Sequence, residues 1–94
     1  MHDSYGFYQF QNLIYRHEMY SRIFDSTNEQ KYLIAEYYFL FNRLNSEKHS
    51  LLLLKDKNII DKIIYIFKLF LKKYDVSKSN IKRINNFLNS INLH

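Results

Sequence analysis

The sequence KNIIDKIIYIFKLFLKKY, from Lys57 to Tyr74, contains the clearest periodic pattern in the chain. Its apolar residues recur at spacings of one, three and four, which is the 3.6-residue period of a helix with one buried face. A strand alternates with a period of two and cannot produce this pattern. The apolar positions are Ile59, Ile60, Ile63, Ile64, Phe67, Phe70, Leu71 and Tyr74. We therefore expect a helix over residues 57–74, capped at its start by Asp56.

Three other segments show a helical period and are separated by short polar stretches. With the segment above, they predict helices at about residues 4–24, 28–44, 57–74 and 78–90. Asp3 or Ser4 can cap the first of these helices. Residues 45–50 are polar and are expected to form a loop, followed by a short buried turn over residues 51–54. Short connections favour antiparallel neighbours, so the simplest arrangement is a bundle of about four helices.

Residues that cap helices lie at the expected breaks between these segments. A capping box can start the second helix, with Ser26 paired to Glu29 or Thr27 paired to Gln30. Residues 75–77, Asp-Val-Ser, end the third helix and leave a serine to start the fourth.

Length and composition favour a single all-α domain. A chain of 94 residues has room for one core, and its 47% hydrophobic content is enough to build one. Proline is absent and Gly6 is the one glycine, so the residues that turn hairpins between strands are missing. We expect one domain over residues 1–94, built almost entirely of helices.

The same composition excludes most enzyme chemistry. There is no cysteine, and a single glycine cannot build a phosphate-binding loop or a nucleophile elbow. The fragment His17-Glu18 begins like a zinc-protease motif but lacks the second histidine of the ligand pair. The nine carboxylates are spread along the expected helices, as solvated faces are. We expect no enzymatic activity, no cofactor and no metal site.

No segment has the pattern of a signal peptide or a membrane span. The N-terminal ten residues lack a basic region followed by an apolar core. The most apolar stretch, Ile59 to Leu71, is interrupted by three charged residues and is shorter than the ~20 residues that a bilayer requires. We therefore expect a cytoplasmic protein that does not enter the membrane.

The net charge of +5 is unevenly distributed. Residues 1–47 contain four basic and six acidic residues, whereas residues 48–94 contain ten basic and three acidic ones. A basic half is typical of proteins that bind phosphate groups. Genome composition is the alternative, because Lys, Asn, Ile, Tyr and Phe, all with AT-rich codons, supply 48 of the 94 residues.

The segment FKLFLKKYDVSKSNIKRINNFL, from Phe67 to Leu88, resembles the helix-turn-helix of bacterial and phage regulators and recombinases. In that motif a helix ends in an aromatic or Lys-Tyr pair, and a Gly-Val-Ser type of turn leads into a short recognition helix. The resemblance implies that Ser77 caps the recognition helix and that the two helices cross at a steep angle. The apolar positions that would hold them together are Phe70, Val76, Ile81 and Ile84.

The resemblance also implies a DNA-contacting surface. Cations would contact phosphates, and Asn or Arg could contact base edges. The implied residues are Lys72, Lys73, Ser77, Lys78, Ser79, Asn80, Lys82, Arg83 and Asn86. Three features depart from the pattern. The helix before the turn is far longer than the short one that the motif normally uses. Asp75 replaces the glycine of the turn and would have to adopt a left-handed conformation, and Leu71 stands where a small residue is usual. An ordinary helical hairpin with solvated lysines is the alternative.

The N-terminal helices carry more aromatic residues than one face can hold. Tyr8, Tyr15, Met19 and Ile23 form a second apolar stripe on the first expected helix. Such stripes are often part of a core, but tyrosine is also well suited to interfaces. We expect Tyr8, Tyr15, Met19 and Tyr38 as candidates for a partner or dimer interface.

Two functional hypotheses follow. The leading one is a DNA-binding regulator in which the aromatic helices form the core or a homodimer seam that suits a palindromic site. The alternative is a protein that acts by binding another protein, such as an inhibitor from a phage or mobile element or a bacteriocin immunity protein. The resemblance to immunity proteins concerns size and charge alone.

Overall fold

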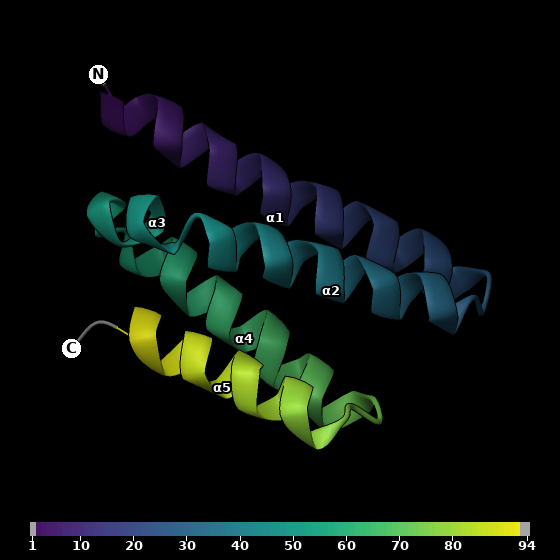
Figure 1. The fold of residues 1–94 in the computed structure, drawn as a ribbon. Helices are drawn as coiled ribbons and strands as arrows, with labels where there is room; N and C mark the ends of the chain where they lie inside the picture. Colours follow the sequence, from purple (N-terminus) through teal and green to yellow (C-terminus); the bar gives the residue numbers. More distant parts are fainter. Residues whose placement is uncertain (1, 93–94) are drawn as a thin grey trace. The chain divides into compact units, whose positions relative to one another are not determined.

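The computed structural model describes the backbone of residues 2–92 and the side chains of residues 8–92. Every regular element in that range is a helix, and the prediction of an all-α fold is confirmed. The helices, shown in Figure 1, are α1 (His2–Ser26), α2 (Gln30–Ser46), α3 (Lys48–Leu54), α4 (Lys57–Lys73) and α5 (Lys78–Ile91). The expected cap at Asp3 or Ser4 lies outside the residues whose side chains are described.

The chain divides into two compact units, residues 1–54 with α1 to α3 and residues 55–94 with α4 and α5. The division separates the charges as well. The first unit contains five basic and six acidic residues, for a net charge of −1, and the second contains nine basic and three acidic residues, for +6. The single-domain organisation expected from the chain length stays a prediction.

The short helix α3 occupies part of a segment for which a loop was expected. α2 continues to Ser46, and only Glu47 separates it from α3. The Glu47 backbone N–H donates to the carbonyl of Arg43, and the Ser46 hydroxyl donates to the same carbonyl at 2.9 Å. The prediction of a loop over residues 45–50 was wrong, because polar residues on the exposed side of a helix do not interrupt its backbone hydrogen bonds.

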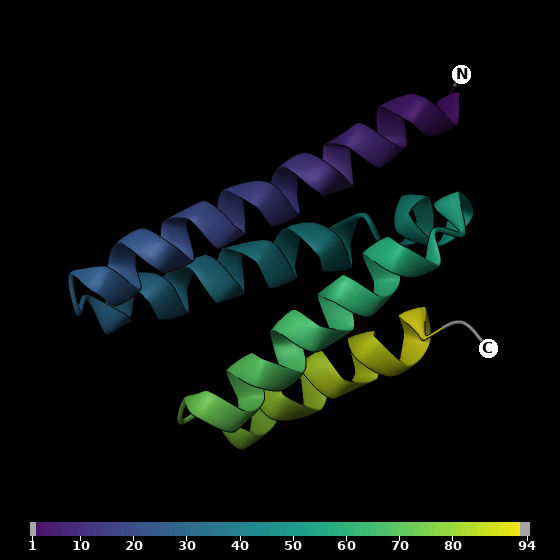
Figure 2. The same cartoon turned by 180° about the vertical axis from the view of Figure 1, so that it is seen from behind.

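In the first unit α1 and α2 lie side by side and run in opposite directions (Figures 1 and 2). Each helix contributes one row of side chains to the core, and α3 adds Leu51. The buried residues of this unit are Phe10, Ile14, His17, Leu33, Tyr37, Leu40, Phe41, Leu44 and Leu51. The pairing follows from the short connection between α1 and α2, which leaves no room for a longer path.

The turn between α1 and α2 differs from the predicted capping box. The hydroxyls of Ser26 and Thr27 donate backwards to the carbonyl of Ile23, at 2.9 and 3.0 Å, and therefore serve the end of α1. Asn28 has a φ of 61°, and the Glu29 N–H donates to the Phe24 carbonyl, which is the pattern of a Schellman cap. Glu29 precedes α2 without a side-chain cap. The prediction was wrong because these hydroxyls can satisfy either helix end.

In the second unit Asp56 caps α4 as predicted. Its side chain accepts hydrogen bonds from the N–H groups of Asn58 and Ile59 at 3.0 and 3.2 Å. α4 then buries a single face, which confirms the helical period of this segment, although Ile64 and Leu71 are half-buried. The buried residues of the unit are Ile59, Ile60, Ile63, Ile66, Phe67, Phe70, Val76, Ile84, Phe87, Leu88 and Ile91.

The α4–α5 connection keeps one implied feature of the helix-turn-helix and lacks another. Ser77 caps α5, because its hydroxyl accepts from the Asn80 N–H at 3.4 Å. Asp75 does not adopt the left-handed conformation; Tyr74 and Ser77 are extended, and the non-glycine residues with positive φ in the described range are Asn28 and Lys55. α5 returns beside α4 in the opposite direction, as an antiparallel hairpin (Figures 1 and 2).

Candidate binding surfaces

Helix α1 has two opposite apolar faces. Phe10, Ile14 and His17 are buried on one side of the helix. At 100° per residue the opposite side carries the outer stripe, which we define as Tyr8, Tyr15, Met19 and Ile23. Tyr8 and Tyr15 are each 63% exposed, and Met19 and Ile23 are also exposed. The second stripe that the sequence predicts on α1 is therefore not covered by the other helices of the unit.

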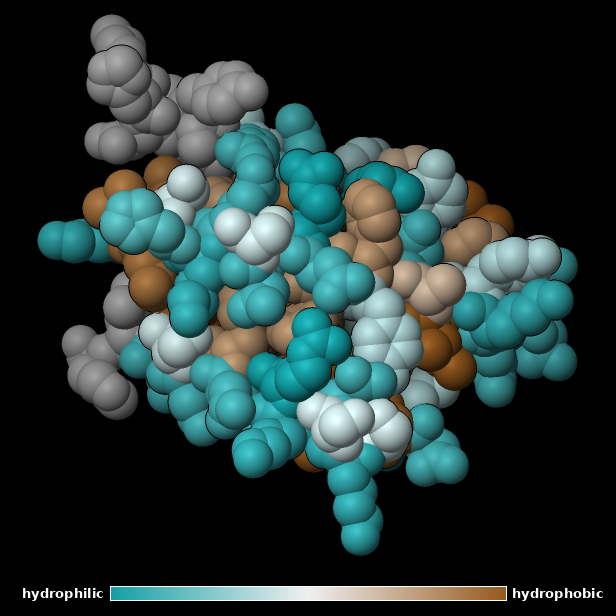
Figure 3. Space-filling view, in the orientation of Figure 1, coloured by the Kyte–Doolittle hydropathy of each residue, from teal (hydrophilic) through white to brown (hydrophobic). Residues whose placement is uncertain are grey.

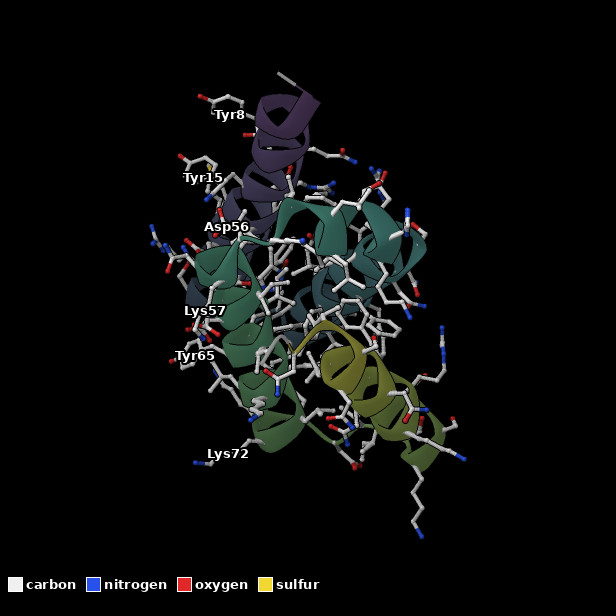
Figure 4. The ribbon with its side chains drawn as sticks, turned by 90° about the vertical axis from the view of Figure 1, so that its left-hand side faces the viewer. Tyr8, Tyr15, Asp56, Lys57, Tyr65 and Lys72 are labelled. Atoms are coloured by element: carbon white, nitrogen blue, oxygen red, sulfur yellow. The ribbon has the colours of Figure 1, made fainter. Side chains whose placement is uncertain are left out.

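The outer stripe differs from ordinary surface apolar residues by its regular spacing. Figure 3 shows hydrophobic groups interspersed among hydrophilic side chains, which is normal for a protein surface. Figure 4 shows Tyr8 and Tyr15 projecting from the same side of α1. Tyr38, also predicted as an interface residue, lies half-buried on α2 and does not belong to this stripe.

A depression of about 370 Å³ opens beside the stripe, between α1 and α2. It is lined by Tyr8, Gln9, Asn12, Leu13, Arg16 and Arg43. Tyr8 belongs to both features, so the depression adjoins one end of the outer stripe. The lining contains two guanidinium groups, two amides and a phenol, and it contains no carboxylate.

Each arginine of the depression is held by one carboxylate at its edge. Arg16 Nη2 lies 3.5 Å from Glu36 Oε1, and its guanidinium packs over the ring of Phe39 at 4.2 Å. Arg43 Nη2 lies 3.8 Å from Glu47 Oε2, which also accepts a 2.6 Å hydrogen bond from Gln9 Nε2. The arginine side chains remain 44% and 47% exposed. Because a guanidinium has five N–H donors, a single long ion pair leaves capacity for a second acceptor.

No local pattern in the sequence indicates this depression. Gln9 and Glu47 are 38 residues apart, and only the pairing of α1 with α2 brings their side chains together. No local spacing could have indicated that Arg16 and Arg43 share one site.

The outer face of α5 has a different chemistry. The helix contains no Asp or Glu, and its exposed residues are cations, amides and hydroxyls. These are Lys78, Ser79, Lys82, Arg83, Asn85, Asn86, Asn89 and Ser90. On α4, Lys57, Tyr65 and Lys72 project from the same side of the helix (Figure 4), and Tyr65 is 68% exposed.

Most of the predicted DNA-contacting residues are exposed, and some have local roles. Lys72, Lys73, Ser77, Lys78, Ser79, Lys82, Arg83 and Asn86 are exposed, whereas Asn80 is half-buried. The Ser77 hydroxyl serves as the α5 cap, and Arg83 donates to Asn80 Oδ1 at 3.5 Å. Lys73 Nζ lies 5.6 Å from the centre of the Tyr74 ring. The side chains of Ser77, Arg83 and Lys73 therefore already have contacts within the chain.

His17 is the one buried polar side chain of the described residues. Its ring meets that of Tyr37 edge-on, with centroids 4.5 Å apart, and Nε2 lies 3.3 Å from the Ser21 hydroxyl. Burial lowers the pKa of His17 to about 4, against smaller raising effects from Glu36 and Glu18. The neutral ring is therefore part of the core of the first unit.

Within the described residues, no group of three His, Cys, Asp or Glu side chains is placed to hold a metal ion. None of the helices in that range combines the length and the apolar character needed to cross a bilayer. Comparison of the chain with protein-family models, curated proteins and solved structures gave no match. The geometry of the surfaces above is therefore the basis for a functional proposal.

Proposed function

We propose that this chain is a non-enzymatic binding protein that recognises another protein through the outer stripe of α1. The observation that carries the proposal is that α1 is apolar on two opposite faces, of which its own unit covers one. Regularly spaced exposed apolar side chains are typical of helical interfaces. Two of the four side chains are tyrosines, which bury a large area at a low cost in conformational entropy.

The alternative explanation of the tyrosines, that they form part of the core, does not fit their exposure. Tyr8 and Tyr15 are each 63% exposed, whereas the core tyrosine Tyr37 is 6% exposed. An uncovered tyrosine contributes little to folding, so its regular placement is better explained by a contact outside the chain.

The experiment places a photo-cross-linking residue at position 15 and identifies the protein that is captured. The affinity of the purified partner is then measured for three proteins. These are the native chain, a double variant that combines Tyr8→Ser with Tyr15→Ser, and the control variant Tyr65→Ser. We expect the double variant to lose binding while its circular dichroism and unfolding transition are unchanged, and the Tyr65 control to bind normally. Equal affinity of the double variant and the native chain would refute the proposal.

A second candidate function is nucleic-acid binding by the outer face of α5. The favouring observation is that this face has no carboxylate and belongs to a unit of net charge +6. Lysines supply phosphate contacts, and asparagine and arginine side chains can reach base edges. Asp75 does not adopt the left-handed conformation that the motif implies, so this candidate rests on the surface of α5 rather than on the turn.

The test of this candidate measures anisotropy of a labelled 24-base-pair DNA and of the matching RNA duplex, at low and at physiological salt. Charge reversal on α5, Lys78→Glu with Lys82→Glu, is compared with the same reversal on α4, Lys62→Glu with Lys68→Glu. We expect the α5 variant to lose more affinity and to reduce the salt slope by about 0.9 per lost phosphate contact. Absence of binding at low salt would eliminate a regulator of transcription.

A homodimer that matches a palindromic site belongs to the same candidate. Sedimentation of the chain with and without a palindromic duplex measures the stoichiometry. Two chains per duplex would support the dimeric regulator.

A further inference from the structure

We propose that the partner presents an amphipathic helix with acidic residues beside its apolar side, and that one carboxylate of this helix enters the depression between Arg16 and Arg43. This inference rests on the proposed protein-binding function of the outer stripe, and it specifies the chemistry of the occupant.

The form of the occupant follows from the shape of the stripe. From Tyr8 to Ile23 it extends over fifteen residue-to-residue steps of helix, which is a length of about 22 Å. The stripe is narrow because it has about one side chain per turn. An apolar row of similar width and length is what one face of a second helix provides.

The charge of the occupant follows from the residues beside the stripe. Arg16 and Arg22 are exposed along this side of α1, whereas Glu18 is half-buried. At the Tyr8 end the depression adds Arg43, again without a carboxylate in its lining. An acidic helix therefore meets cations at both sides of its apolar row, and charge-assisted hydrogen bonds to guanidinium are the strongest available there.

The depression is better suited to one carboxylate than to a nucleic acid. Glu36 and Glu47 already partner the two arginines, and the first unit has a net charge of −1. A polyanion would bring many charges close to these carboxylates, whereas a single carboxylate can use the remaining N–H donors. Asn12 and Gln9 provide amide groups in the same lining.

A second copy of this chain is a poorer occupant. It would bring the same exposed cations, Arg16 and Arg22, to the other side of the seam. Like charges that face each other across a helical interface are destabilising. A partner of opposite charge avoids this cost.

The probes are three 18-residue helical peptides with the same leucine row, flanked by glutamates, by glutamines or by lysines. Their affinities are measured by anisotropy against the native full chain. We expect the glutamate peptide to bind about tenfold more tightly than the glutamine peptide, since a charge-assisted pair contributes about 1.4 kcal/mol or more. The lysine peptide should bind most weakly.

Two variants locate the effect. Arg43→Gln removes one of the two cations of the depression and should reduce the preference for glutamate over glutamine, while Arg16 and Arg22 retain part of it. Lys31→Gln removes an exposed cation of the same unit that lies on α2, neither in the depression nor beside the stripe, and serves as the matched control. Tyr15→Ser should weaken all peptides alike, because it shortens the apolar row.

The outcomes separate this inference from the function on which it rests. Equal binding of the three peptides, with loss in Tyr15→Ser, overturns the acidic partner and leaves the protein-binding surface intact. Failure of every peptide at 1 mM also overturns the inference, and the cross-linking experiment then decides the function. A dimer in sedimentation that Tyr15→Ser dissociates would show that the stripe pairs with a second copy, which contradicts the proposal.

Discussion

Helices α1 and α5 both bury one side, but their exposed sides are chemical opposites. The exposed side of α1 carries tyrosine, methionine and isoleucine, and that of α5 carries lysine, asparagine and serine without a carboxylate. AT-rich codons can supply both tyrosine and lysine in excess. They do not place Tyr8 and Tyr15 in one exposed row on α1, and they do not keep carboxylates off α5.

A helical period shows that a row of apolar side chains exists, but it does not show whether that row is buried in the core or exposed. A buried row stabilises the fold, whereas an exposed row of the same kind is available for a partner. α1 has both, and α5 has the first together with a polar surface suited to phosphate.

The largest effect concerns the two faces of α1. Phe10 is fully buried, so Phe10→Ala should reduce the free energy of unfolding by about 3–5 kcal/mol through lost burial and a residual cavity. Tyr15→Ala on the opposite face should change it by less than about 0.5 kcal/mol. Urea unfolding of the full chain measures both. A Tyr15 loss comparable to that of Phe10 would show that the stripe is packed rather than free to bind.

The next effect is a pH dependence of the free energy of unfolding, and it arises from His17 in the core of the first unit. Between pH 6.5 and 4 the unfolded chain binds a proton at His17 that the folded chain excludes, because burial lowers the pKa of His17 to about 4. The free energy of unfolding should therefore fall as pH decreases through this window, by up to about 3 kcal/mol, and this contribution is complete above pH 7.

The measurement compares urea unfolding of the native chain and of His17→Gln at several pH values. The difference between the two should shrink toward pH 4, since the variant has no proton to exclude. Parallel curves for the two proteins would contradict a buried neutral His17.

A smaller effect is expected at the helix starts. Asp56→Ala and Ser77→Ala remove side-chain caps and should each cost about 1 kcal/mol. Glu29 precedes α2 without a capping hydrogen bond, so Glu29→Ala is the matched control and should be nearly neutral. Thermal unfolding measures the three variants. Equal losses would mean that the caps are not what stabilises these helix starts.

The smallest effect concerns an ion pair on the exposed side of α4. Lys57 Nζ and Asp61 Oδ2 are 3.2 Å apart, and both side chains are largely exposed. Asp61→Asn should cost less than about 0.5 kcal/mol, and the loss should disappear at 1 M salt. A larger loss that persists in salt would indicate a packing role for Asp61.

Local signals predicted much of the fold and part of the candidate surface. The period of residues 57–74, the caps at Asp56 and Ser77 and the second stripe of α1 all depend on neighbours within a few turns. The errors lie where the same residues could serve either of two adjacent structures. Ser26 and Thr27 could satisfy the end of α1 or the start of α2, and only the formed turn selected the first.

Residue order and the constant period of a helix are enough to predict that this chain is helical, where its apolar rows run and how its charge is distributed. Tertiary structure alone decided which row of α1 is covered and which stays exposed, since two similar rows compete for one core. It also brought Gln9 to Glu47 and Arg16 to the same depression as Arg43. Contacts between residues so distant in the chain exist only after α1 and α2 have paired.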